Sequence, residues 1–150
     1  MTQNNVQPSY AAHIGKPRPG TIAGTNSDIG TGICETVAGI GFGLAVTQGA
    51  GDNGVVLGGA TKFIGISVKD ITLGAGFDAY PQYASLGVNK KGFTWVAPAV
   101  AVVCGDPVTY VSATGRLSNT GGVAIPGARW ADSSDADGAA RVELMANAGS

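Results

Sequence analysis

The sequence predicts an all-β protein: a small barrel- or sandwich-like domain of short strands with an extended N-terminal arm. Three observations support this prediction. Glycine supplies 25 of the 150 residues, and such an excess is typical of turns and bulges that other residues resist. Apolar residues alternate with small or polar residues in several short runs, which is the period of a strand. No stretch of about eleven residues carries the apolar stripe and the caps of a helix.

The first 30 residues are predicted to form the arm, and residues 31–150 the β-domain. Prolines favour extended backbone, and here they stand among polar residues with only isolated apolar side chains. Such a segment is either a frayed terminus or an arm that becomes ordered on a partner. The candidate anchors of the arm are Val6, Pro8, Tyr10, Ile14, Pro17 and Pro19.

The predicted strands follow one another at short intervals, with Gly-containing turns between them. In chain order they are residues 33–37, 41–47, 62–68, 86–90, 93–97, 100–103, 108–112, 129–131 and 140–145. Residues 89–92 are predicted to form a hairpin turn between two of these runs, and residues 112–115 a second turn leading into residues 116–118. A helix over residues 78–86 is disfavoured by Pro81.

The composition argues against nucleic-acid and membrane partners. The formal net charge is −1 and charged residues are 13% of the chain, whereas nucleic-acid binding needs a basic face. The N-terminus lacks the cationic and apolar regions of a signal peptide, and no apolar stretch is long enough to cross a bilayer. Cys34 and Cys104 lie in apolar runs, so we expect both to be buried and unpaired in a protein made in a reducing cytoplasm.

Catalysis and metal binding are not predicted. The single histidine, His13, lies in the arm, so a nucleophile–histidine pair would have to form on that segment. One histidine and two distant cysteines do not make a zinc site. Residues 39–43 have the glycines of a dinucleotide fingerprint but continue as a strand. Residues 132–138 are acidic like a calcium loop, but Glu143 misses the twelfth position by one residue. We therefore expect no enzyme, no cofactor and no metal.

The order of several short motifs resembles the structural cement, or capsid decoration, proteins of tailed bacteriophages. The resemblance covers about residues 60–146 and rests on FIGISVKD at 63–70, GFTWV at 92–96, GDPVTYV at 105–111, and residues 128–130 with 140–144. It implies a β-barrel-like subunit on the outer capsid surface of a virion, which binds the major capsid protein and assembles as a homotrimer. The arm is then a capsid-binding arm. The candidate core or trimer-interface residues are Phe63, Phe93, Trp95, Tyr110 and Trp130.

Two alternatives belong to other functional classes. The first is a different virion element, such as a fibre base or an adhesion module. The second is a trimeric β-fold hydrolase, which predicts a pocket lined by convergent polar groups. A cement protein needs no such pocket, because it stabilises a shell by binding the assembled form and not the separate subunits.

Overall fold

The computed structural model describes residues 19–23, 28–69 and 79–144, and this part of the chain is all β, which confirms the predicted fold class. Its regular elements are strands, and no helix capable of spanning a membrane occurs among them. In chain order the strands are β1 (Asp28–Cys34), β2 (Ile40–Gly41), β3 (Ala45–Gln48), β4 (Gly54–Leu57), β5 (Phe63–Ser67), β6 (Ala79–Tyr80), β7 (Ser85–Val96), β8 (Pro107–Tyr110), β9 (Leu117–Ser118), β10 (Val123–Trp130) and β11 (Ala140–Leu144).

Five strands close into a small barrel. β1 pairs with β4, β4 with β3, β3 with β5, β5 with β7, and β7 pairs back with β1. All of these pairings are antiparallel except that of β1 with β4, which is parallel. Closure satisfies the backbone groups on both sides of each strand, so the barrel has no free sheet edge to protect.

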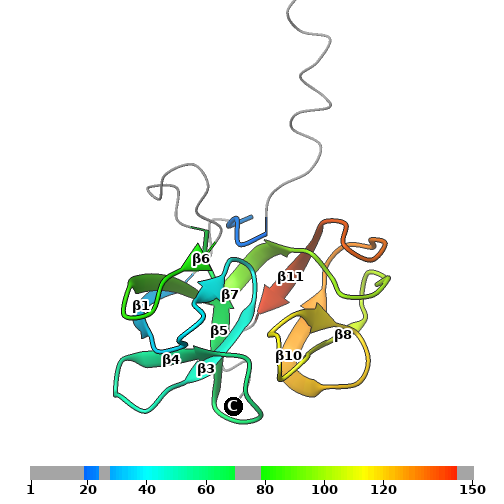
Figure 1. Ribbon diagram of the computed structural model, residues 1–150. Coiled ribbons are helices and arrows are strands. Elements are labelled where there is room, and N and C mark those ends of the chain that lie inside the picture. The colour runs from blue at the N-terminus through cyan, green and yellow to red at the C-terminus, as the bar shows by residue number, and fades with distance from the viewer. Residues whose placement is uncertain (1–18, 24–27, 70–78, 145–150) are drawn as a thin grey trace, which may run out of the picture.

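An open sheet forms the second lobe, and it begins with the C-terminal half of β7. Its order is β7-β11-β10-β8-β9. The barrel strands β1, β3 and β4 lie on one side of β7, and β8 and β10 lie on the other (Figure 1). A separate short ribbon pairs β2 with β6.

The strand β7 is continuous through the predicted hairpin at residues 89–92, so that prediction is wrong. The side chain of Asn89 is fully buried and donates a hydrogen bond to the hydroxyl of Thr94 within the same strand. Gly92 has a φ of 98°, a conformation that side chains other than glycine rarely adopt. A local turn signal therefore marks the residue at which β7 passes from the barrel to the open sheet.

Other strand predictions differ in extent. Residues 100–103 form only an isolated bridge between Val102 and Ser134, and the predicted strand at 129–131 is the end of the longer β10. The strand expected at 33–37 ends at Cys34 and begins at Asp28. The strand β4 was not predicted from the sequence. The turn at residues 112–115 is confirmed, with Gly115 N donating to Val111 O at 2.7 Å.

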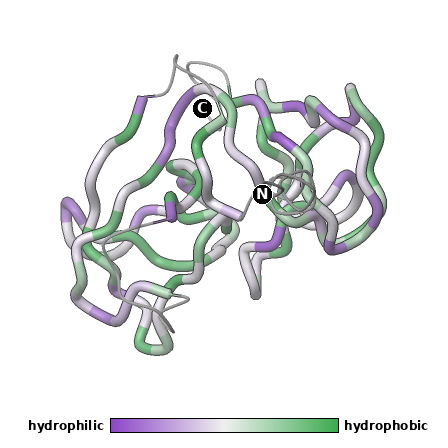
Figure 2. Tube along the Cα trace, turned by 90° about the horizontal axis from the view of Figure 1, so that it is seen from above, coloured by the Kyte–Doolittle hydropathy of each residue, from purple (hydrophilic) through white to green (hydrophobic). Residues whose placement is uncertain are grey.

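Two buried clusters fill the molecule. The barrel interior holds Cys34, Ile40, Val46, Val55, Tyr80, Leu86 and Val88. A larger cluster lies between the open sheet and the barrel and is centred on Trp130 and Tyr110, both fully buried. Seen from above, hydrophobic and hydrophilic segments alternate along the chain in both lobes (Figure 2). Hydrophobic segments therefore contribute to both lobes.

The turn between β3 and β4 is organised around one carboxylate. Glu35 accepts hydrogen bonds from the backbone N–H of Ala50 at 2.7 Å and of Gly51 at 3.0 Å. Gly49 and Gly54 lie so close to this carboxylate that a Cβ on either would overlap it. The glycines in this turn therefore make room for a side chain that supplies the hydrogen-bond acceptor for the turn's backbone.

The N-terminal segment 19–23 extends the open sheet beside β7. Gly20 N donates to Trp95 O at 2.7 Å, Trp95 N donates to Thr21 O at 2.9 Å, and Ala23 N donates to Phe93 O at 3.0 Å. Since β1 begins at Asp28, this strand starts within the range predicted as arm. The described chain thus begins at the Val96 end of β7.

The two cysteines differ in environment. Cys34 is fully buried in the barrel, as expected, but Cys104 is exposed, so that part of the prediction is wrong. Cys104 lies in the turn before β8, where its backbone N–H donates to the Ser133 hydroxyl. The apolar run that contains Cys104 is a surface loop held by such hydrogen bonds rather than a strand.

Candidate functional site

Three of the five aromatic residues predicted for the core or a subunit interface lie in the core. Trp130 and Tyr110 are fully buried, and Trp130 Nε1 donates to Ser118 O at 3.1 Å. The Phe63 ring packs beside that of Tyr110, with ring centroids 5.7 Å apart. These three side chains are turned inward and offer little surface to a partner.

The other two aromatic residues lie on the outer face of the open sheet. In register, Phe93 is opposite Glu143 and Trp95 is opposite Arg141. The Arg141 guanidinium lies over both rings, at 5.3 Å from the Phe93 centroid and 5.7 Å from that of Trp95. Since both rings are half-buried, this surface is aromatic with a cation fixed above it.

Arg141 is held in place by Asp132. Its Nε donates to one carboxylate oxygen at 2.7 Å, and an Nη donates to the other at 2.9 Å. The hydrogen bond from Arg141 holds the pKa of Asp132 below its ordinary value and raises that of Arg141. A bidentate pair of this kind fixes the guanidinium plane over the two rings.

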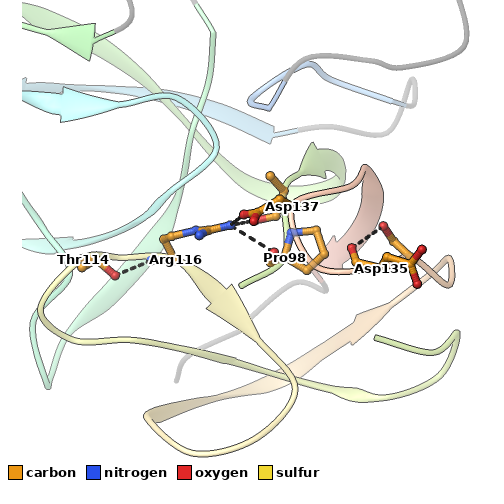
Figure 3. A network of polar contacts seen from close by, with 7 residues as sticks. Pro98, Thr114, Arg116, Asp135 and Asp137 are labelled. Carbon is orange, nitrogen blue, oxygen red and sulfur yellow. Dashed lines mark hydrogen bonds and ion pairs between the residues drawn. The ribbon is translucent and has the colours of Figure 1, made fainter. Parts of the chain in front are cut away.

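Arg116 links three loops of the open-sheet lobe (Figure 3). One of its terminal nitrogens donates to Asp137 at 2.6 Å and to Pro98 O at 3.0 Å. Asp137 N in turn donates to Pro98 O at 2.9 Å. The acidic loop weighed as a calcium site therefore has Asp132 and Asp137 engaged with arginines. No group of three potential metal-ligating side chains occurs in the described part of the chain.

An exposed apolar surface, which we call the β1 face, was not predicted from the sequence. Ile29 and Ile33 point outward from β1 with Thr31 between them and are 50% and 43% exposed. Tyr83 N donates to Cys34 O, which brings Tyr83 to the end of β1, and its side chain is 74% exposed. Val37, in the turn after β1, is 81% exposed. The alternation of Ile29, Thr31 and Ile33 with glycines was the sequence feature that could have indicated this surface.

The candidate arm residues are only partly described. Pro19 is exposed and precedes the turn at Gly20. Val6, Pro8, Tyr10, Ile14 and Pro17, like His13, lie outside the described residues.

A small pocket opens at one end of the barrel. It has a volume of about 210 Å³ and is lined by Thr31, Gly32, Gln48, Asp52, Asn53, Gly54, Val55, Ile64, Val88 and Lys90. Its ionisable groups are one carboxylate and one ammonium, and its lining contains no thiol, hydroxyl–histidine pair or second carboxylate.

The chain is similar in sequence and in fold to known proteins. The family described as structural cement protein (E217 gp24/Pam3 gp6) matches residues 6–145. A chain in the capsid of Myoviridae phage XM1 has the same fold, with a TM-score of 0.72 and 18% identity over 85% of this chain and 89% of that chain. A head fibre gp8.5 N base of bacteriophage phi29 aligns with a TM-score of 0.48 and 10% identity, over 79% and 95% of the two chains. No curated protein matches.

Proposed function

The chain belongs to the phage structural cement protein family, and we propose that it binds the major capsid protein as a homotrimer on the outer surface of the shell. Family membership over residues 6–145 is the observation that carries this conclusion. It gives the chain a cement or decoration role on the capsid, in the virion, and implies a structural rather than an enzymatic part.

Cementing is a linkage effect. A protein that binds the assembled shell but not the separate capsid subunits lowers the free energy of the shell by mass action. A trimer that touches several capsid subunits must break every contact before it leaves, so its overall affinity exceeds that of one contact. The closed barrel supports this role, because a body without free edges keeps its shape while its surfaces bind.

Residues 1–18 of the predicted arm are proposed to add a second contact with the capsid. They join the body at Pro19, where the backbone of the next residues is already paired with β7. An extended segment of eighteen residues spans up to about 60 Å, which is several times the radius of so small a domain. The anchors Val6, Tyr10 and Ile14 are spaced by four residues, so in an extended chain they face the same way.

The test uses expanded shells that lack the protein. Purified protein should cosediment with these shells to a fixed ratio and raise the temperature at which they dissociate, measured by light scattering. Cryo-electron microscopy of the particles should show density repeated regularly over the shell. Density at a single vertex or on the tail would instead support a fibre base, and absence of binding would contradict the cement role.

A deletion of residues 2–18 tests the arm. It stops before Pro19 because Gly20 bonds to both β7 and Lys69 N, so the body should melt as before. We expect capsid affinity to fall at least tenfold. Serine at Val6, Tyr10 and Ile14 together should reproduce most of this loss, whereas serine at Asn4 and Gln7 should not. Unchanged binding by the truncated protein would reject the arm as a capsid contact.

A further inference from the structure

Exposed apolar side chains of the barrel lobe gather on the β1 face. Ile29, Ile33, Val37 and Tyr83 are between 43% and 81% exposed, which is unusual for four large apolar side chains so near one another. On β7, their in-register neighbours on the same face are Ser85, Gly87 and Asn89, none of them charged. The β1 face is therefore apolar where it borders β7, while Thr31 shares a pocket lining with the ionisable side chains of Asp52 and Lys90.

Tyr83 adds a second anomaly at the same place. Its φ of 67° is a left-handed conformation that a bulky side chain rarely adopts. The backbone is held there by hydrogen bonds from Tyr83 N to Cys34 O and from Ala84 N to Pro81 O. A strained backbone that presents a largely exposed aromatic ring is characteristic of a binding position.

We propose that the β1 face is the contact between copies of this chain, and that it meets the open-sheet lobe of the next copy. This deepens the proposed function by naming the surface that forms the homotrimer. In a ring of three a surface cannot meet itself, so it must meet a different surface of its neighbour. The other large apolar side chains exposed in the described chain, Val100, Val103 and Val111, all belong to the open-sheet lobe.

Two features favour a second copy as the occupant. The two lobes lie on opposite sides of β7 (Figure 1), so a surface on each lobe can meet a different neighbour in a head-to-tail ring. The four side chains expose on the order of 500 Å², more than half of what one partner contributes to an ordinary interface.

The experiment measures self-association in the absence of any capsid, by sedimentation equilibrium. Ile33→Glu and Val103→Glu should each weaken association at least tenfold, because each places a charge in one half of the contact. Thr61→Glu, at an exposed turn position outside both surfaces, should assemble as the wild type does. A mixture of the two weakened variants should form heterodimers, because the intact half of each can still pair with that of the other.

Tyr83→Gly separates binding from folding. Glycine relieves the left-handed backbone, so this variant should melt no lower than the wild type, yet its association should weaken at least fivefold. A monomeric wild type at tens of micromolar would overturn the proposal, as would normal assembly of Val103→Glu or of Ile33→Glu. Because no shell is present, a failure here is distinct from a failure of capsid binding. If these variants assemble normally but lose capsid binding, the β1 face contacts the capsid instead.

Discussion

The barrel and the open sheet differ in how the backbone hydrogen-bonding groups at their strand edges are satisfied. The barrel closes on itself, so most backbone groups of its strands are paired with a neighbouring strand. The open sheet has two edges. The segment 19–23 pairs with β7 at one edge, and the two-residue strand β9 pairs with β8 at the other. All three ion pairs between described residues lie in the open-sheet lobe: Arg116–Asp137, Arg129–Glu143 and Arg141–Asp132.

The two lobes are therefore expected to be sensitive to different kinds of substitution. The barrel depends on glycines that allow close approach, as around Glu35, and so it is sensitive to added volume. The open-sheet lobe depends on side chains that link its loops, and so it is sensitive to the loss of a charge or a hydrogen bond. Charged pairs at partly exposed positions contribute modestly, whereas steric overlap in a packed turn does not relax easily.

The largest expected effect is in the barrel. Gly54→Ala places a methyl group where the Glu35 carboxylate lies, which should displace that side chain and leave the β3–β4 turn without its acceptor. We expect a loss of about 3 kcal/mol in the free energy of unfolding, measured by urea denaturation. The control is Gly87→Ala, whose new Cβ would find its nearest neighbours at 3.6 Å. Equal losses from both substitutions would show that overlap with Glu35 is not the cause.

An intermediate effect is expected in the open-sheet lobe. Asp132→Asn weakens the bidentate pair with Arg141 and should cost about 1 kcal/mol at neutral pH, since both side chains are partly exposed. The hydrogen bond from Arg141 lowers the pKa of Asp132 in the folded protein. The wild type therefore has this contribution above the unfolded pKa, near 4, and loses it as the pH falls through the lower folded value.

Thermal unfolding between pH 7 and pH 2.5 measures this contribution. The stability difference between wild type and Asp132→Asn should shrink as the medium becomes acidic. Glu143→Gln is the matched control, because its partner Arg129 has a side chain that is 55% exposed, and its effect should be smaller. A constant difference across this range would mean that Asp132 acts through packing and not through its charge.

The smallest effect compares one tyrosine from each lobe. The hydroxyl of Tyr110 is buried and has no hydrogen-bond partner among the described residues, and burial raises its pKa. Tyr110→Phe removes an unsatisfied group and should change stability by less than about 0.5 kcal/mol or raise it. In the barrel, Tyr80 donates to Val68 O at 2.5 Å, so Tyr80→Phe should cost about 1 kcal/mol. Calorimetry that found a larger loss for Tyr110→Phe would reveal a partner for its hydroxyl.

The strand content could be predicted because alternation is a local property. Residues 62–68 and 140–145 have it clearly, and both are strands, β5 and β11. The prediction of a hairpin at residues 89–92 was wrong because Asn89 and Gly92 are residue types that are common in turns. Their roles depend on partners far away in sequence: Asn89 lies opposite Ile66 in β5, and Gly92 lies opposite Leu144 in β11.

The surfaces were harder to predict than the core. Trp130 and Tyr110 are large and apolar and are buried as such residues usually are. Ile29 and Ile33 have the same character, but β1 turns them outward while its glycines and Cys34 face the barrel interior. Which face of an alternating strand is buried depends on the neighbours that the topology supplies. The sequence shows the alternation without showing that choice.

Gly92 sets the geometry between the lobes. A single left-handed residue in β7 fixes the angle at which one strand leaves the barrel and enters the sheet, and no flexible linker intervenes. The positions of the two lobes relative to each other are therefore set by β7 itself, because the same strand belongs to both of them.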